Sequence, residues 1–265
     1  MRRRLVVGNW KMNGSVELCR SMIPLMIEAA AGGIESASGR AVELVICPPA
    51  LHIAAVATMA ASSALSVGAQ NVSALGNGAH TGEISATMLR ELGCRHAIVG
   101  HSERRAQFGE SDADAAEKAR ACVANGITPI VCVGETETQR FEGRTREVVA
   151  RQVGAVVARL GAADLARCAI AYEPVWAIGT GKTATPAEAQ AVHAFIRACV
   201  SAVDPAVARA VPILYGGSLK ATNAVQLFAM PDVDGGLVGG ASLQAAEFLR
   251  IYEAACDRRV EQTVD

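Results

Sequence analysis

The stretch "CAIAYEPVWAIGTGK", from Cys168 to Lys182, joins a short apolar run to a glycine-containing loop through one acidic residue, Glu173. The apolar run predicts a buried β-strand. The tail "GTGK" resembles the phosphate loop of nucleotide hydrolases, which needs a further glycine five positions before the one that precedes the lysine. That position holds Trp176. The spacing therefore disfavours a nucleotide-hydrolase loop, and Glu173 becomes the candidate for chemistry.

The residues after this stretch predict where the next helix begins. Thr185 can cap a helix, Pro186 suits the first helical position, and Glu188 completes a capping box. A phosphate-loop helix would begin at the lysine instead. Lys182 is therefore predicted to lie in a free loop.

Short apolar runs rich in Val, Ile and Leu alternate with longer alanine-rich segments of helical character along the chain. Such strands are typical of parallel sheets buried on both faces, and the alternation predicts right-handed βαβ units. There are eight runs: "LVVGNW" from Leu5, "ELVICPP" from Glu43, "LSVGAQN" from Leu65, "HAIVGHS" from His96, "TPIVCVGE" from Thr128, "CAIAYEP" from Cys168, "PILYGGS" from Pro212 and "GGLVGGAS" from Gly235. We expect an α/β fold, a single (β/α)8 barrel domain over residues 1–265. An open doubly wound sheet is the alternative, but no Gly-x-Gly-x-x-Gly segment follows the first run.

Composition excludes several classes of protein. The chain has 265 residues, 51% of them hydrophobic, and a net charge of −1, which argues against a nucleic-acid surface. No apolar run has the length needed to cross a membrane, and the initial "MRRRLVV" is too short for an export signal. Eight scattered cysteines without a Cys-x-x-Cys pair are typical of buried thiols in a reducing compartment. We expect a soluble cytoplasmic protein without a metal site.

Polar residues and glycines follow directly after several of the predicted strands. In a parallel barrel these strand ends meet at one rim, where the active sites of barrel enzymes lie. Alone, each residue has a structural explanation, such as a solvated lysine, a core histidine or a turn glycine. Together they predict a site with a base, a cation and a phosphate-binding backbone: Asn9, Lys11, His101, Ser102, Glu103, Glu173, Gly216, Gly217, Ser218, Gly239 and Gly240.

The rate acceleration that a general base alone supplies is smaller than the acceleration that enzymes reach, so such a base needs further groups that stabilise negative charge. A general base supplies about 10²–10⁴-fold in rate, or roughly 3–5 kcal/mol, whereas enzymes lower barriers by roughly 8–23 kcal/mol. One preorganised donor to a developing oxyanion adds about 2.7–4 kcal/mol. His101 and Lys11 are the groups that could supply this help to Glu173.

Five segments together closely resemble the triose-phosphate isomerase family: "GNWKMNG" at Gly8, "GHSERR" at Gly100, "AYEPVWAIGTGKTAT" at Ala171, "YGGSLK" at Tyr215 and "LVGGASL" at Leu237. The resemblance covers the whole chain and implies the TIM-barrel fold. It implies a cofactor-free isomerase that interconverts D-glyceraldehyde 3-phosphate and dihydroxyacetone phosphate through an enediolate. Glu173 would be the general base, neutral His101 the electrophile, Lys11 the positive charge, and Asn9 a further catalytic contact.

The resemblance also implies supporting roles around these residues. Asn9 and Lys11 would contact the substrate, and its phosphate would be bound by Gly179, Ser218, Gly239 and Gly240. Glu103 would steady the cation, Ser102 would hydrogen-bond the base, and Cys132 would pack behind it. Residues 174–182 would form a lid whose apolar part excludes water.

A long connection reads "NVSALGNGAHTGE" from Asn71 to Glu83. The resemblance implies a homodimer in which this 71–83 loop enters a second subunit, with Thr81 near that subunit's Asn9 and Lys11. Many relatives have an aromatic residue where this chain has His80, which bears on interface packing and not on the chemistry.

Other activities remain open at this point. A relative acting on a four-carbon ketose phosphate would share the core motifs. A barrel aldolase would use Lys11 as a Schiff-base amine, but here the lysine follows the first strand and a carboxylate base lies elsewhere. A phosphate-ligand sensor or surface-adhesion protein would not need the full set of acid–base groups.

Overall fold

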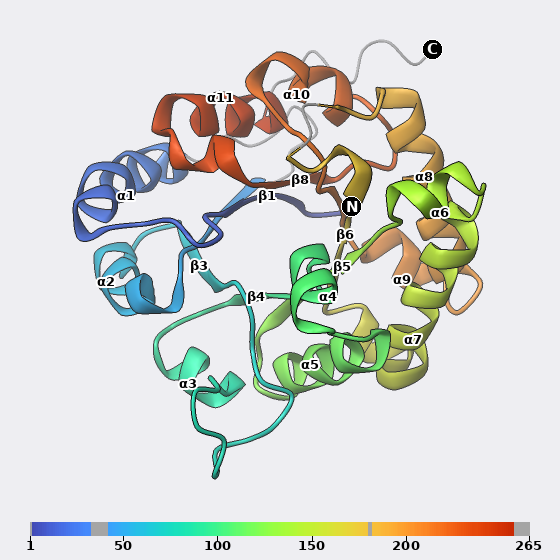
Figure 1. Cartoon of the computed structure of the whole chain (residues 1–265). Coiled ribbons are helices and arrows are strands. Elements are labelled where there is room, and N and C mark those ends of the chain that lie inside the picture. The colour runs from blue at the N-terminus through green and yellow to red at the C-terminus, as the bar shows by residue number, and fades with distance from the viewer. Residues whose placement is uncertain (1, 33–41, 180–181, 257–265) are drawn as a thin grey trace.

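The computed structural model describes residues 2–32, 42–179 and 182–256. Eight parallel strands follow one another around a closed barrel, and β1 pairs with β8 as well as with β2 (Figure 1). The predicted (β/α)8 barrel is therefore confirmed, and the open sheet is excluded. The strands are β1 Arg4–Asn9, β2 Val42–Cys47, β3 Ser66–Ala69, β4 His96–Val99, β5 Thr128–Val133, β6 Ala169–Tyr172, β7 Ile213–Tyr215 and β8 Gly235–Val238.

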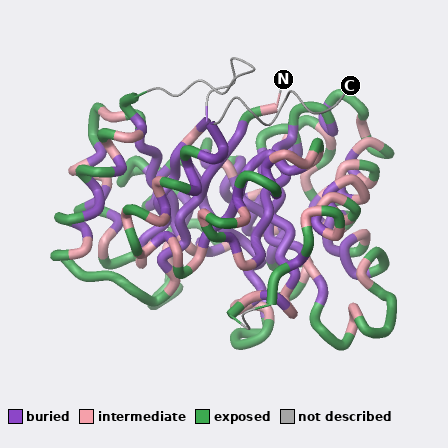
Figure 2. The backbone as a smooth tube through the Cα atoms, turned by 90° about the horizontal axis from the view of Figure 1, so that it is seen from above, coloured by how far each residue is buried: buried purple, intermediate pink, exposed green. Residues whose placement is uncertain are grey.

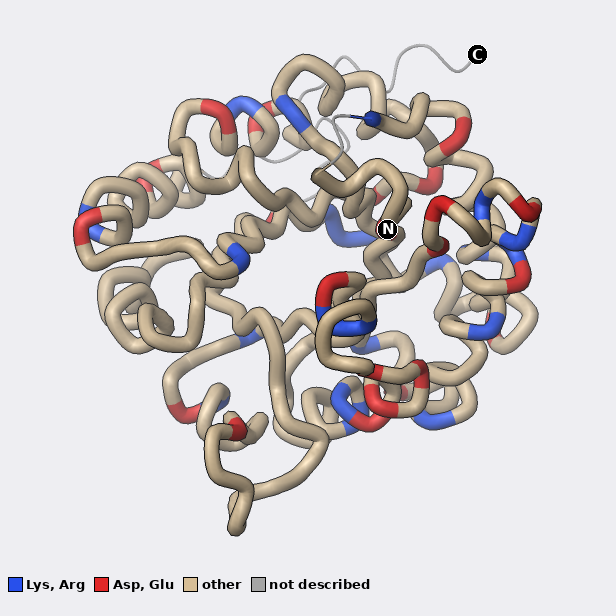
Figure 3. The backbone as a smooth tube through the Cα atoms, viewed as in Figure 1, with Lys and Arg blue, Asp and Glu red and all other residues tan. Residues whose placement is uncertain are grey.

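Helices surround this barrel and cover its outer face (Figure 1). They are α1 Val16–Ala31, α2 Ala50–Ala60, α3 Ala86–Glu91, α4 Ser102–Phe108, α5 Asp112–Ala124, α6 Glu137–Phe141, α7 Thr145–Leu165, α8 Pro186–Ser201, α9 Pro205–Ala210, α10 Ala221–Phe228 and α11 Ala245–Cys256, with short 3-10 turns η1 Val175–Ala177 and η2 Gly240–Leu243. Within the described ranges, no helix combines the length and hydropathy that crossing a bilayer requires. Most charged residues lie on these outer helices (Figure 3).

Alternation along each strand separates two hydrophobic layers, because successive side chains of a strand point to opposite faces. One set packs in a small cluster of its own inside the barrel: Leu5, Val7, Val45, Cys47, Ile98, Ile130, Cys132, Ala169, Ala171, Leu214 and Leu237. The residues between them, such as Val6, Ile46 and Val131, belong to the larger cluster that includes the helices. Figure 2 shows that the buried part of the chain lies at the centre of the molecule. Burial on both faces explains the near-continuous apolar runs.

Helix starts follow the capping residues in the sequence. The Thr185 hydroxyl accepts the Glu188 N–H at 3.2 Å, and the Glu188 carboxylate accepts the Thr185 N–H at 2.8 Å. Pro186 is the first residue of α8. The predicted capping box is confirmed, and Lys182 lies before the helix in a loop, as expected. Ser111 and Thr136 form equivalent capping boxes at α5 and α6.

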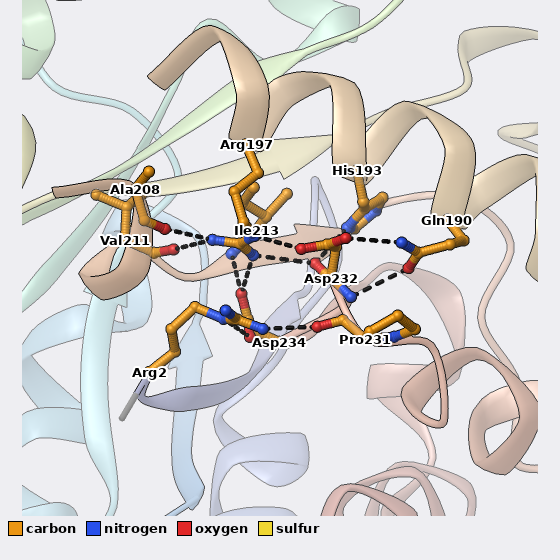
Figure 4. A network of polar contacts seen from close by, with 10 residues as sticks. All are labelled: Arg2, Gln190, His193, Arg197, Ala208, Val211, Ile213, Pro231, Asp232 and Asp234. Carbon is orange, nitrogen blue, oxygen red and sulfur yellow. Dashed lines mark hydrogen bonds and ion pairs between the residues drawn. The ribbon is translucent and has the colours of Figure 1, made fainter. Parts of the chain in front are cut away.

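A polar network centred on Arg197 ties α8 to the segments that precede β7 and β8 (Figure 4). The guanidinium contacts Asp232 at 2.5 Å and Asp234 at 2.7 Å, and it donates to the carbonyls of Ala208 and Val211. Asp234 also accepts the backbone N–H of Ile213, the first residue of β7, at 2.9 Å. The network therefore lies at the amino ends of these strands.

All eight cysteines fall within the described residues and none forms a disulfide. Seven are buried, and Cys199 on α8 is half-buried. Burial raises the pKa of the Cys94 thiol to about 11 and that of Cys168 to about 12. These side chains therefore act as small apolar core groups, as their scattered positions predict.

Candidate active site

The carboxyl ends of the strands surround an open cavity of about 280 Å³. Its lining comes from β1, β4, β6, β7 and β8, whose ends meet on one side of the barrel (Figure 1). The topology therefore brings together residues that are far apart in the sequence. All eight residues predicted to be catalytic or to bind phosphate line this cavity: Asn9, Lys11, His101, Glu173, Gly179, Ser218, Gly239 and Gly240.

Glu173 follows β6 directly and is only 2% exposed. Two glycines make room for it. A Cβ atom at Gly134 would lie 1.7 Å from the Glu173 carbonyl oxygen, and one at Gly216 would lie 3.0 Å from its Cγ. The backbone at Gly134 therefore lies closer to Glu173 than any residue with a side chain would allow, and the contact at Gly216 would be tight.

Two donors hold the Glu173 carboxylate. Oε2 accepts the backbone N–H of Ser102 at 2.8 Å, and Oε1 lies 2.9 Å from Nε2 of His101. Burial alone would raise the pKa of Glu173, but the charge and hydrogen bond of His101 and the Ser102 N–H outweigh it and lower the pKa. The group is therefore ionised at neutral pH. Ser102 makes this hydrogen bond with its backbone amide.

His101 is the N-cap residue of α4, and its Nδ1 accepts the Glu103 N–H at 3.2 Å. Nδ1 must keep its lone pair for this bond, so the ring proton lies on Nε2 and points to Glu173. Burial lowers the pKa of His101, but the carboxylates of Glu173 and Glu103 outweigh burial and raise it. Loss of the Glu173 contact would remove the largest influence that raises the pKa of His101, so the ring would shift toward its neutral form.

Lys11 lies in the left-handed region, with φ 51°. Two side chains hold this unusual backbone. Asn9 Oδ1 accepts the Lys11 N–H at 2.9 Å, and Gln70 donates to the Lys11 carbonyl at 2.8 Å and to the Cys47 carbonyl at 2.9 Å. Gln70 was not predicted as a site residue. It directly follows β3, which is the position that identified the other rim residues.

The Lys11 ammonium contacts the Glu103 carboxylate at 2.5 Å. A Cβ atom at Gly239 would lie 3.3 Å from Lys11 Cε, so glycine allows the lysine to cross close to the end of β8. Glu103 thus links the cation to the first turn of α4, beside His101. The predicted pairing of Glu103 with the cation matches this geometry.

Cys132 lies inside the barrel on β5 and is fully buried. Burial and the nearby Glu173 charge raise the pKa of its thiol well above the ordinary value. The raised pKa favours a neutral thiol at this position. Within the described part of the chain, no group of three or more His, Cys, Asp or Glu side chains is placed to hold a metal ion.

Comparisons with known proteins show which family the chain is similar to. A sequence model described as triosephosphate isomerase matches residues 4–255. The triosephosphate isomerase of Thiobacillus denitrificans is 55% identical over 96% of this chain and 99% of the relative. That of Ralstonia nicotianae is 53% identical over 96% and 99%, and that of Herminiimonas arsenicoxydans is 50% identical over 96% and 100%. The chain belongs to the triosephosphate isomerase family. The predicted family of isomerases is thereby confirmed.

The segment after Glu173, where we expect the family's lid, is anchored to the loop after β5. Trp176 Nε1 donates to Glu135 Oε1 at 2.9 Å, and the Tyr172 hydroxyl lies 3.1 Å from the same carboxylate. The Arg140 guanidinium stacks on the Trp176 ring at 4.1 Å. Gly179 has φ 72°, a conformation that favours glycine. Residues 180–181 lie outside the described residues.

Glu135 and Arg140 were not predicted. Glu135 directly follows Gly134 at the end of β5, and its side chain is fully buried. Its position was visible in "TPIVCVGE", but its role needed the partners from β6 and η1. Arg140 also pairs with Glu188 at 2.6 Å, which joins α6 to the start of α8.

The 71–83 loop projects from the barrel beside α3 (Figure 1). His80 and Thr81 in this loop are exposed. A second cavity, of about 640 Å³, lies between the loop's base and the active site. Its lining includes Asn9, Lys11, Gln70, His101 and Glu103, so the two cavities share the side chains at the ends of β1 and β4.

Proposed function

We propose that this site interconverts D-glyceraldehyde 3-phosphate and dihydroxyacetone phosphate through an enediolate, without a cofactor. One observation carries the proposal. An ionised, almost fully buried carboxylate, Glu173, faces a cavity that also holds the His101 ring, a lysine and the glycine-rich ends of β7 and β8. Proton abstraction beside a carbonyl requires this combination of a base and electrophiles.

Glu173 removes a proton from one carbon of the substrate and returns it to the neighbouring carbon. To reach the substrate, the carboxylate leaves the Ser102 N–H and the His101 ring, which lie 2.8 and 2.9 Å away. Those contacts lower the pKa of Glu173, so their loss makes the carboxylate a stronger base as it approaches the carbon acid.

His101 and Lys11 stabilise the negative charge that develops on the enediolate oxygens. The His101 Nε2–H is freed when Glu173 moves, and it donates to these oxygens as a neutral imidazole. Lys11 supplies a full positive charge, and Asn9 holds its backbone in place at 2.9 Å. Preorganised donors of this kind contribute about 2.7–4 kcal/mol each.

The phosphate is bound by backbone N–H groups at Gly179, Ser218, Gly239 and Gly240. Glycine lets the backbone approach the dianion closely. Asn223 supports the geometry of the loop after β7, because its amide donates to the Ser218 carbonyl at 3.0 Å and its Oδ1 accepts the Lys220 N–H at 2.9 Å. Closure of residues 174–182 then excludes water and protects the enediolate from losing phosphate.

The protein works as a homodimer through the 71–83 loop, which enters the 640 Å³ cavity of a second copy. Exposed apolar side chains around that cavity support this, since Met12 is 97% and Phe108 67% exposed. The whole chain forms one functional domain in the cytoplasm, where its free thiols stay reduced. Sedimentation at micromolar concentration tests the dimer, and a monomer would contradict it.

A coupled isomerase assay tests the function. The wild-type chain should convert both triose phosphates, and Glu173→Asp, which withdraws the carboxylate by one methylene, should lower kcat by at least about 100-fold. Near-normal turnover in this variant would reject Glu173 as the base. A higher kcat/KM on a four-carbon ketose phosphate would reject the triose as the substrate. A borohydride-stable adduct on Lys11 would indicate an aldolase, and absence of proton exchange in D₂O would indicate a sensor.

A further inference from the structure

The chain has only four lysines among its 25 basic residues, and three of them pair with a glutamate. Lys11 contacts Glu103 at 2.5 Å, Lys118 contacts Glu110 at 2.6 Å, and Lys182 contacts Glu137 at 2.6 Å. The fourth, Lys220, is exposed and has no carboxylate within ion-pair distance among the described residues. Its charge is therefore available to a ligand.

Lys220 lines the 280 Å³ cavity at the end where Ser218, Gly239 and Gly240 lie. It immediately precedes α10, and Asn223 fixes it by accepting its backbone N–H at 2.9 Å. The same Asn223 donates to the Ser218 carbonyl at 3.0 Å. Lys220 and the phosphate-binding backbone are thus held in one rigid turn.

The surroundings leave this lysine as an unneutralised cation beside the cavity. The Glu247 carboxylate reaches the neighbouring Ala221, whose N–H it accepts at 2.8 Å, and it makes no ion pair with Lys220. The chain as a whole has a net charge of −1, which gives no general attraction for an anion. Attraction of a dianionic substrate must therefore come from local charges near the cavity.

We propose that Lys220 draws the substrate's phosphate dianion into the cavity and contributes to its selection over uncharged sugars. This inference rests on the proposed function. Lys220 acts on the phosphate and not on the reacting carbons, so it affects binding and capture and leaves the proton transfer unchanged. Because Lys220 is exposed, salt screens its contribution, with a Debye length of about 10 Å at 0.1 M.

The test compares Lys220→Gln with Lys220→Arg at low and high ionic strength. Lys220→Gln should lower kcat/KM roughly threefold to fivefold at about 10 mM salt, as expected for one exposed charge, with kcat unchanged. The deficit should largely disappear at about 300 mM salt. The inhibition constant of inorganic phosphate should rise in parallel, and Lys220→Arg should behave as the wild type.

Arg209→Gln is the matched control, because Arg209 is exposed on α9, precedes β7 and has no ion pair among the described residues. It should leave kcat/KM unchanged at both salt concentrations. The inference is overturned if Lys220→Gln equals this control at low salt, or if its deficit persists at high salt. An inactive wild type would instead reject the proposed function, so the two failures are distinguishable.

Discussion

Two polar networks in this barrel contain similar residues but differ in how fully their donors are used. The Arg197 network (Arg2, Gln190, His193, Arg197, Asp232 and Asp234) lies at the amino ends of β7 and β8 (Figure 4). The Glu173 cluster (Lys11, His101, Glu103 and Glu173) lies at the carboxyl ends of the strands. Each contains carboxylates, a histidine and a cation.

Every N–H of the Arg197 guanidinium has an acceptor. Nε and Nη2 donate to the two aspartates, Nη2 also to the Asp232 carbonyl, and Nη1 to the Ala208 and Val211 carbonyls. The Lys11 ammonium, by contrast, makes one hydrogen bond, to Glu103, among the described residues. Saturated donors fix a structure, whereas donors left over beside a cavity can serve a substrate.

The two histidines differ in the same way. Burial lowers the pKa of His193 to about 4, so this ring stays neutral, and its Nδ1 lies 3.1 Å from the Asp232 carbonyl. The His101 pKa is raised, since Glu173 lies against the ring. His193 keeps its contact with the Asp232 carbonyl, while the His101 pKa depends on Glu173, the carboxylate that we propose as the mobile base. This contrast leads to four predictions.

The largest effect is expected from Arg197→Met, which breaks the saturated network. It removes the cation that contacts the buried Asp234 and the half-buried Asp232, and Asp234 keeps its ion pair with Arg2 at 2.6 Å. Loss of one partner of a buried ion pair destabilises a protein by about 3–5 kcal/mol. Urea unfolding measures this loss. The kcat of the folded fraction should stay close to that of the wild type, because the network lies at the opposite strand ends from the site. A loss of less than about 1 kcal/mol in the free energy of unfolding would contradict the view that the Arg197 network stabilises the fold.

Lys11→Met is the converse experiment on the Glu173 cluster. Removal of this charge should lower kcat/KM by about 10²–10³-fold, or about 2.7–4 kcal/mol of transition-state stabilisation. Since the Lys11 side chain is 28% exposed and pairs with a partly exposed glutamate, unfolding by urea should change little. If Lys11→Met unfolds readily but keeps full activity, Lys11 stabilises the fold and does not act on the substrate, which would contradict the proposal.

Glu43 on β2 provides a pH-dependent test of a second structural contact. Its carboxylate lies 2.8 Å from His96 Nε2 and accepts the Ser66 hydroxyl at 2.7 Å. Burial would raise its pKa, but His96 and Ser66 outweigh burial and lower the pKa to about 2. The resulting stability is present above the unfolded pKa of about 4.3 and is lost as the pH falls toward 2.

The difference between the folded and unfolded pKa values of Glu43 corresponds to at most about 3 kcal/mol of folding free energy. Unfolding free energies of the wild type and Glu43→Gln, measured at pH 6 and pH 3, should differ more at pH 6. The same difference at both pH values would show that the lowered pKa does not stabilise the fold. Turnover of the folded protein should not respond to Glu43→Gln.

The smallest effect is expected from Gln70→Leu. This change removes the donor to the Lys11 and Cys47 carbonyls, a loss of about 1 kcal/mol in stability. It should also lower kcat/KM a few-fold, because the Lys11 backbone at φ 51° loses one of its supports. Gln70→Glu controls for size, since it keeps the shape but not the donor. Unchanged kinetics in both variants would remove Gln70 from the site.

Strand-end positions made much of this site predictable from sequence. Lys11, His101 and Glu173 each follow an apolar run, and barrel topology alone brings such positions together. Gln70 and Glu135 follow runs in the same way, but their importance depends on partners from other strands. A residue's type and position do not reveal which backbone carbonyl or ring it will meet.

Backbone contributions were the least predictable part. The Ser102 amide holds Glu173, and the Gly134 backbone lies against the Glu173 carbonyl. Neither contact could be expected from the residue types at these positions, because both are made by the backbone. The capping box at Thr185 was predictable because its partners lie three residues apart and its geometry is local. Non-local backbone contacts have no comparable signature.

The distribution of cysteines has a practical consequence for spectroscopy. With seven thiols buried, Cys199 on α8 is the position where a maleimide dye can attach to the native chain. A fluorophore or spin label could therefore be introduced at one defined place without first deleting other cysteines. Each deletion would open a void in a tightly filled interior, so a wild-type background preserves the energetics that such measurements aim to observe.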